Sequence, residues 1–268
     1  MRTDGFEYLR VEIRNRILFI TFNRPDKLNA CNAAGHDEMP RVLREFGATD
    51  EADVAVVTGA GRAFSVGGDF DLVEEVNHDP AGRIPGLISS ASELVRAHID
   101  LDKPIVAAIN GPAFGAGAAF GLLCDFIVME QQARISDGHL RGALAAGDGG
   151  VLIWPLAVGM VKAKQYLLTA DWVTADEAER LGLVTEVVEE GESLARATEI
   201  AERLAKAPQV ALRYTKRALH HWLRQAWPIF DHSLSLEAIT MARPEVQVAL
   251  DSLRESRTPA MPPDPRNP

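Results

Sequence analysis

The sequence predicts a mixed α/β fold, in which a core of strands and helices is followed by a helical C-terminal region. Strand-length apolar runs alternate with segments of helical periodicity through the first 190 residues. Two of the runs lead into glycine-rich turns, and from Gly191 onward the periodicity is helical. We therefore expect a core over residues 1–190, a helical region over 191–257 and a disordered, proline-rich tail over 258–268.

Composition limits the partners and the compartment. The formal net charge is −10 and no long basic run occurs, so nucleic acid is not an expected partner. The two cysteines, Cys31 and Cys124, lie in apolar stretches and cannot form a disulfide framework, which favours a reduced, cytoplasmic location. Residues 1–10 lack the apolar core of a signal peptide, and no run of about 18 apolar residues occurs, so no membrane association is expected.

The first elements follow from local periodicity. Two strand-like runs, Glu7–Arg14 and Ile17–Phe22, are separated by two polar residues and predict a hairpin. Apolar residues at helical spacing predict a helix over Asn32–Phe46, in which Pro40 either lies near the first turn or causes a bend. The apolar run Asp53–Thr58 predicts a buried strand.

The next segment should cover one side of the sheet. A short helix is expected over Asp69–Val76 with Asp69 as its cap, and the proline and glycine residues of 78–86 predict a mobile loop. The amphipathic run Ile88–Leu101 predicts a helix that packs on the sheet and leaves His98 at the surface. Thr174 opens a capping box at a later helix start. Further strands are expected over Pro104–Ile109, Phe126–Glu130, Ala133–Ser136 and Leu183–Val188, and further helices over Ser193–Ala207, Gln209–Ala226 and Pro228–Met241.

Two glycine-rich turns are the features on which the functional prediction depends. Asn110–Asp125 reads as a turn followed by a buried helix, and Arg62–Asp69 is a second such turn after a strand. Glycine and alanine allow close backbone approach, and the first turn of a helix has free N–H groups. A dinucleotide-binding turn is set aside, because Gly121 follows Gly115 and Gly117 at a spacing one residue too long. The two turns can supply converging donors for a negative oxygen.

These segments resemble the crotonase, or enoyl-CoA hydratase/isomerase, superfamily. Phe64–Asp69 is similar to its first oxyanion-hole motif, Asn110–Asp125 to its second, and Asn23-Arg24-Pro25 with Leu28-Asn29-Ala30 to its N-terminal signature. The resemblance continues through Gly147–Gly150 into the C-terminal third and covers roughly residues 7 to 257. It implies a spiral of ββα units, a helical C-terminal region for trimer contacts, and a homotrimer or a dimer of trimers.

The resemblance also implies the chemistry of the site. The backbone N–H groups of Gly68 and Ala116 would hold the carbonyl oxygen of an acyl-CoA thioester. Coenzyme A would be part of the substrate, with no permanently bound cofactor and no metal. The positions expected around the acyl group are Ala30, His36, Phe64, Ala119 and Glu237, and those expected near the CoA phosphates are Arg24, Lys27, Arg254 and Arg257.

This chain departs from the family at its two acid–base positions. The hydratase pattern has two glutamates, because adding water to a double bond requires one group for the water and one for the proton at Cα. Here the matching residues are Ala119 and His139. Asp148 follows His139 by nine residues in a glycine-rich loop, so a His–Asp pair that activates water is predicted. In the alternative, His139 is an ordinary buried histidine and Asp148 caps the following helix.

The predicted pair resembles a branch of the superfamily that hydrolyses carbon–carbon bonds of β-diketones. Gly35–Glu38 resembles a segment of the same branch, which adds His36 as a candidate, and Glu237 is a further candidate acid. That branch has a histidine where this chain has Ala116, and Ala116 favours a CoA thioester. Three functions remain: water addition or hydrolysis at an acyl-CoA, hydrolysis of a cyclic β-diketone or β-keto thioester, and acyl-CoA binding without catalysis.

Overall fold

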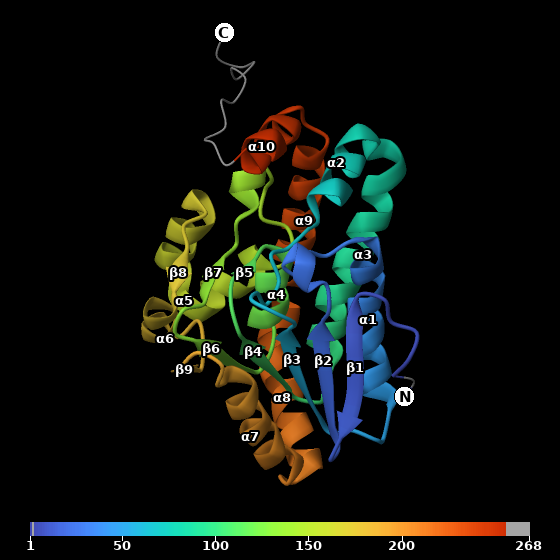
Figure 1. Ribbon diagram of the computed structural model, residues 1–268, viewed down its shortest axis with the longest axis vertical. Helices are drawn as coiled ribbons and strands as arrows, with labels where there is room; N and C mark the ends of the chain where they lie inside the picture. The colour runs from blue at the N-terminus through green and yellow to red at the C-terminus, as the bar shows by residue number, and fades with distance from the viewer. Residues whose placement is uncertain (2, 256–268) are drawn as a thin grey trace.

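The computed structural model describes residues 1 and 3–255 and confirms the α/β class (Figure 1). A six-stranded sheet in the order β1-β2-β3-β4-β6-β9 is parallel except for the β1–β2 hairpin, and a smaller sheet has the order β5-β7-β8. The strands are β1 (Leu9–Arg14), β2 (Ile17–Phe22), β3 (Val54–Gly59), β4 (Ile105–Ile109), β5 (Ala113–Phe114), β6 (Phe126–Glu130), β7 (Arg134–Ser136), β8 (Val173–Thr174) and β9 (Glu186–Val188).

The helices enclose both sheets. They are η1 (Pro25–Lys27), α1 (Ala33–Ala48), α2 (Phe70–His78), α3 (Pro80–Asp100), α4 (Ala116–Leu122), η2 (His139–Gly142), α5 (Gly150–Thr169), α6 (Ala175–Leu181), α7 (Ser193–Ala205), α8 (Gln209–Gln225), α9 (Trp227–Met241) and α10 (Glu245–Arg254). Pro40 lies inside α1, and Asp69 caps α2 by accepting from Asp71 N–H. The ββα arrangement of the crotonase type is therefore as predicted.

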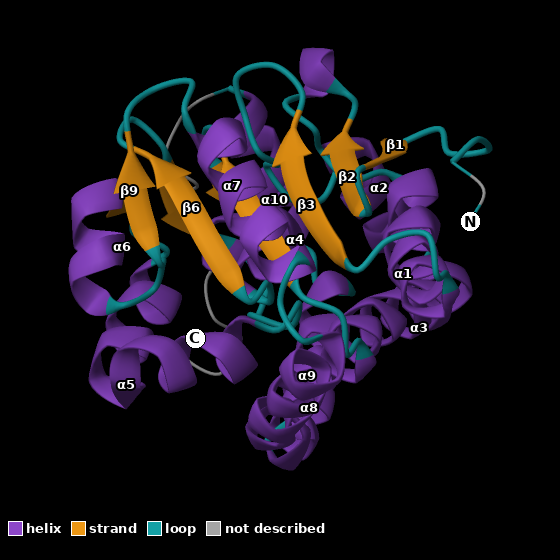
Figure 2. Ribbon diagram, turned by 90° about the horizontal axis from the view of Figure 1, so that it is seen from below, coloured by secondary structure: helices purple, strands orange, loops and turns teal. Residues whose placement is uncertain are grey.

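The larger sheet is buried on both faces. On one face α7 crosses the strands, where Ile200 and Leu204 pack with Phe19, Val56 and Val106 (Figure 2). On the other face α1, α3 and α4 form the main apolar core with the remaining strand side chains. A parallel sheet covered on both faces gives the continuous apolar runs by which β3 and β4 were predicted.

The predicted mobile loop over 78–86 is wrong. Residue His78 ends α2, and α3 begins at Pro80. The Asp79 side chain accepts a hydrogen bond from Gly82 N–H, and proline fits the first helical position because it has no N–H to leave unpaired. The Asp-Pro pair is thus a helix start, and two joined helices stand where a loop was expected.

The prediction that His98 lies at the surface is also wrong. Its side chain is 1% exposed, because α3 is covered on a second side by α4 and α8. Nδ1 lies 3.2 Å from Leu94 O, and the ring packs edge-on against Phe120 with 4.5 Å between the ring centroids. Burial lowers the pKa of His98 to about 3, so the ring is neutral.

Smaller departures concern element ends. Thr174 precedes α6, but its side chain makes no capping hydrogen bond, and Glu177 pairs with Arg180 instead. The last strand of the sheet covers only Glu186–Val188, and α10 was not predicted. The expected disordered tail, 258–268, and Arg257 lie outside the described residues.

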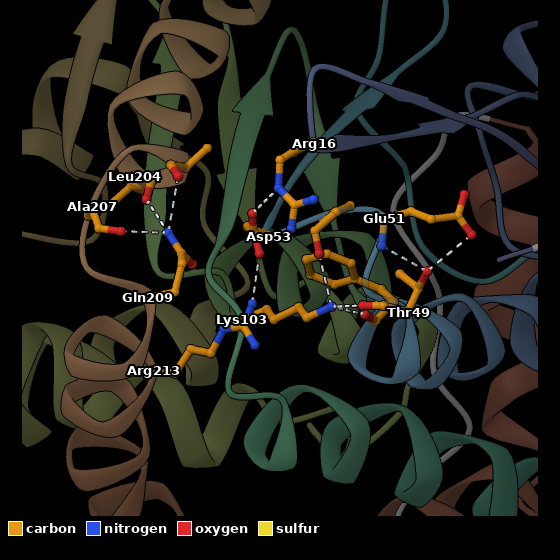
Figure 3. Close-up of polar contacts among 12 residues, drawn as sticks. Arg16, Thr49, Glu51, Asp53, Lys103, Leu204, Ala207, Gln209 and Arg213 are labelled. Carbon is orange, nitrogen blue, oxygen red and sulfur yellow. Dashed lines mark hydrogen bonds and ion pairs between the residues drawn. The ribbon is translucent and has the colours of Figure 1, made fainter.

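Partly buried ion pairs attach α8 to the core. Arg213 of α8 and Arg16 of the hairpin turn both bind Asp53, at 2.8 and 2.5 Å (Figure 3). Lys216 of α8 donates to Asp125 at 2.7 Å, just after α4. The division at residue 190 stays a prediction.

Large apolar side chains are exposed in groups on α5, α8 and α9. They are Leu156, Met160, Val161 and Leu168 on α5, Val210, Tyr214, Leu219 and Trp222 on α8, and Ile229, Leu236 and Ile239 on α9. The predicted trimer contacts are not tested by a single chain and stay a prediction. Helix α5 is apolar and long enough to cross a membrane by composition, but its backbone at Gly159 is not helical, so neither half reaches about 20 residues.

Candidate active site

The two glycine-rich turns lie side by side. Phe114 N–H donates to Ser65 O at 2.9 Å, and a Cβ on Gly67 would lie 2.8 Å from Phe114 O. Gly67 also has a φ of 80°, a conformation that favours glycine. The close approach brings Gly68 and Ala116 to the wall of one pocket.

Both expected donors are free to bind a ligand. At this turn Cys31 N–H donates to Gly67 O, and Asp69 N–H donates to Cys31 O. Gly68 N–H, which lies between them in the chain, makes no hydrogen bond to any described residue. Ala116 is the first residue of α4, where a backbone N–H has no intrahelical acceptor. The arrangement can hold an oxygen that carries developing negative charge.

The N-terminal signature supports the first turn from behind. Asn29 is fully buried, and its side-chain amide donates to the carbonyls of Ala60, Ala63 and Phe64 at 2.9, 2.8 and 3.2 Å. Its backbone carbonyl accepts from Ser65 Oγ at 2.8 Å. These contacts fix the turn that carries Gly68.

His139 lies among three carboxylates. Its Nδ1 is 2.8 Å from Asp137 Oδ1, and its Nε2 is 3.2 Å from Asp148 Oδ2 and 3.6 Å from Glu237 Oε1. His139, Asp137 and Glu237 are buried. The contact between His139 and Asp148 is therefore present, although it required a nine-residue segment to fold back.

Two glycines make room for this cluster. A Cβ on Gly147 would lie 1.9 Å from Glu237 Oε2, and a Cβ on Gly150 would lie 2.1 Å from Asp137 Oδ2. Helix α5 begins after Gly149 without a side-chain cap, so Asp148 is not a helix cap. The loop is built so that its carboxylate meets the imidazole.

The roles within the pair differ from the sequence prediction in one respect. Asp148 was expected to bind one ring nitrogen while the other faced water. Asp137, which was not predicted, binds Nδ1, whereas Asp148 lies on the Nε2 side with Glu237. Asp137 follows β7 directly and precedes His139 by two residues, a local signal that was overlooked.

The surrounding charges determine the protonation of the cluster. Burial lowers the pKa of His139, but the charge and hydrogen bond of Asp137 outweigh it, and with Asp148 they raise the pKa well above 6.5. Burial raises the pKa of Asp148, but the His139 hydrogen bond and charge outweigh it and lower the pKa below 3.8. Burial, with the charge of Asp148, raises the pKa of Glu237 well above 4.5. These directions favour an imidazolium at His139, a carboxylate at Asp148 and a carboxylic acid at Glu237.

The same three groups have the spacing of a cation site. Ligand atoms of His139, Asp148 and Glu237 all lie within 4.8 Å of one another, and Asp137 orients the imidazole through its contact with Nδ1. The raised pKa values mean that protons already supply positive charge here. A metal would have to displace them.

The pocket is otherwise apolar. Its volume is about 100 Å³. Its wall includes Leu72, Val73, Leu87, Ile88 and Leu234. The aromatic rings of Phe70 and Phe114 also line the pocket. His36, in the first turn of α1, lines it as well.

A second pocket continues from the first. Val66, Gly68 and Phe114 line both, and the second also carries Lys27, Ala30, Arg62, Arg141 and Arg254. Lys27 and Arg254 thus line a pocket that adjoins the two glycine-rich turns, although Arg254 already pairs with Glu74 at 2.7 Å. Arg62 and Arg141 were not predicted, and no sequence pattern distinguished them from other surface arginines.

Three predicted positions lie elsewhere. Phe64 is fully buried against Phe22, with 5.2 Å between the ring centroids, so its side chain belongs to the core. Ala119 is buried within α4. Arg24 donates to Asp69 at 2.9 Å and to Ala30 O at 2.7 Å, which gives its guanidinium a structural contact.

Comparison with known proteins agrees with this geometry. Residues 12–259 match the profile of the family described as enoyl-CoA hydratase/isomerase. The chain belongs to this family. It is 34% identical to a short-chain-enoyl-CoA hydratase of Clostridium acetobutylicum over 80% of this chain and 81% of that protein. It is 30% identical to a crotonyl-CoA hydratase of Syntrophomonas wolfei over 87% of this chain and 88% of that protein.

Solved structures of the enoyl-CoA hydratase/isomerase family share the fold. An enoyl-CoA hydratase/isomerase from Mycobacterium paratuberculosis has a TM-score of 0.88 and 34% identity, with 94% of this chain and 99% of that chain covered. An enoyl-CoA hydratase from Mycobacterium avium subsp. paratuberculosis has a TM-score of 0.87 and 26% identity, with 97% and 100% covered. This family member is accordingly an enzyme of the crotonase superfamily.

Proposed function

We propose that this enzyme adds water across the α,β double bond of a short acyl-CoA thioester. The observation that carries the proposal is the group of three side chains, His139, Asp148 and Glu237, beside two free backbone donors. Two relatives are named as hydratases of short enoyl-CoA esters, which supports the same reaction class. The family's two glutamates are absent, but this cluster contains both a proton acceptor and a proton donor.

The proposed reaction uses each group once. The thioester oxygen accepts hydrogen bonds from Gly68 and Ala116 N–H, which stabilise the enolate as water oxygen bonds to Cβ. Asp148 takes the proton that the water loses. The carboxylic acid of Glu237 then protonates Cα.

His139 restores the starting state in this proposal. Its Nε2 lies 3.2 Å from Asp148 and 3.6 Å from Glu237, so it can return a proton from the first to the second. Asp137 holds Nδ1 and stabilises the imidazolium. His139 thus acts as a charged relay between the two acids, with the water's proton taken by Asp148, a refinement of the histidine base expected from the sequence.

The remaining parts of the proposal concern the ligand and assembly. Coenzyme A enters as part of the substrate, through the pocket that carries Lys27, Arg62, Arg141 and Arg254, and no cofactor is held permanently. Arg257 is proposed as a further phosphate contact. We also propose a homotrimer or dimer of trimers that covers the exposed apolar faces of α5, α8 and α9.

Hydrolysis of a carbon–carbon bond in a β-diketone or β-keto thioester is the second candidate. The contact between His139 and Asp148 favours it, because the sequence resemblance associates this pair with that chemistry. It would use the same water and the same oxyanion donors. The product distinguishes it from hydration, since hydrolysis opens or shortens the carbon chain.

The test is turnover of crotonyl-CoA, a longer enoyl-CoA, a β-ketoacyl-CoA and a cyclic β-diketone by the wild type, His139→Ala and Glu237→Gln. His232→Ala is the matched control, because His232 is exposed on α9. We expect hydration of an enoyl-CoA, a loss of about 10²-fold or more in both site variants with binding retained, and no change in the control. Equal rates in His139→Ala and the wild type would refute the relay, and binding without turnover would support a non-catalytic subunit.

A further inference from the structure

His36 is a buried polar side chain without a partner. Its side chain is 9% exposed, and the ring lines the acyl pocket from the first turn of α1. Nδ1 is fully buried with no hydrogen bond, whereas Nε2 is not among the buried unbonded atoms and is the ring nitrogen that a ligand in the pocket can reach. An acyl group that covered Nε2 without bonding to it would remove its water and leave it unpaired, so an oxygen of the ligand is expected there.

The ring offers a neutral donor and a neutral acceptor. Burial lowers the pKa of His36, and the opposing charges of Asp148 and Asp37 do not reverse this. A neutral imidazole has one N–H and one lone pair, which suit a hydroxyl or a ketone oxygen. An acyl group with its own carboxylate would be repelled by the Asp148 charge and would gain no ion pair from His36.

The oxygen in question is distinct from the reacting water. The water is assigned to Asp148, which with His139 and Glu237 forms a group of mutually bonded side chains. His36 belongs to α1 and makes no hydrogen bond to that group. The pocket wall is otherwise mostly apolar, so a simple hydrocarbon chain would cover Nε2 of His36 and give it no hydrogen-bond partner.

From these observations we infer that the natural acyl group carries a neutral oxygen, a hydroxyl or a ketone, beyond the reacting double bond, and that His36 binds it. The inference rests on the proposed function, because it names the substrate class of the same site. A site that bonds a substrate oxygen discriminates strongly against the analogue that lacks it, since the analogue leaves the buried group unpaired.

Saturated CoA esters test this inference without turnover. Calorimetry compares butanoyl-CoA with 4-hydroxybutanoyl-CoA, and pentanoyl-CoA with 4-oxopentanoyl-CoA, on the wild type and on His36→Phe. In at least one pair we expect the wild type to bind the oxygenated ester about tenfold more tightly, and His36→Phe to reduce that ratio to about one. His232→Phe is the control at an exposed position and should keep the wild-type ratio.

Each outcome decides between the possibilities. A wild-type ratio below about twofold in both pairs overturns the inference, as does a ratio that His36→Phe leaves unchanged. If His36→Phe does not fold, His36→Gln keeps a polar end and should give an intermediate ratio. Because the esters lack a double bond, loss of the proposed hydration would leave this ratio intact, and loss of the ratio would leave hydration intact.

Discussion

Replacing Gly147 with alanine should disable the site without altering any ionisable group. The new Cβ would lie 1.9 Å from Glu237 Oε2 and 2.6 Å from Glu237 Cβ, whereas carbon and oxygen atoms normally stay more than 3 Å apart. The Glu237 carboxyl must therefore move by more than about 1 Å, and a displacement of that size in a reacting group costs on the order of 10² in rate. We expect kcat for the active enoyl-CoA to fall by about that factor.

The assay separates displacement of the acid from general damage. Gly86→Ala is the matched control, because Gly86 lies within α3 and a Cβ there has no atom within 4 Å. This alanine should leave the rate unchanged and the free energy of unfolding equal or higher, since alanine favours a helix more than glycine does. A Gly147→Ala, Glu237→Asp double variant shortens the acid by one methylene and should recover part of the lost rate. Wild-type kcat in folded Gly147→Ala would refute the assignment of Glu237.

Three further predictions follow from the charges. The wild-type kcat/KM should stay level from pH 7.5 to 5.5, since the raised pKa of His139 keeps the ring protonated, whereas an enzyme with a histidine base of pKa 6.5 would lose about tenfold in kcat/KM. In Asp137→Asn, NMR titration should find a lower pKa for His139. The pKa of His98 is about 3 in the folded state and about 6.5 in the unfolded state, so the unfolded state takes up a proton as the pH falls from 7.5 to 5 and the free energy of unfolding decreases by about 2 kcal/mol. Urea titration should find a smaller decrease in His98→Phe. Chelation by EDTA should leave turnover unchanged, because protons supply the positive charge of the cluster; inactivation restored by a divalent ion would contradict this.

Local patterns predicted most elements of the fold. The hairpin, the buried strands and the C-terminal helices each have a periodicity that their own residues display. The segment 78–86 failed because proline and glycine were read as loop signals, whereas Pro80 after Asp79 starts a helix. His98 failed for a different reason: one helix does not reveal how many of its faces other helices will cover.

The sequence indicated the site residues, Glu237 among them through the family resemblance, but not all of the contacts between them. Gly68, Ala116, His139 and Asp148 all came from contiguous segments, and the structure brings them to one pocket. Asp137 was within reach of the same reasoning but was overlooked. The position of Glu237 beside His139 depends on the docking of α9, which no spacing along the chain encodes.

Because Glu237 belongs to α9, the site cannot be complete until late in the synthesis of the chain. Synthesis runs from the N-terminus, and about 90 residues separate Gly147 from Glu237, which a ribosome adds in roughly 5 to 20 seconds. During that interval a nascent chain already contains both glycine-rich turns and the His139 loop, but not the carboxyl that fills the space beside Gly147. The group of His139, Asp148 and Glu237 is therefore completed only when nearly the whole chain has been made and α9 has docked.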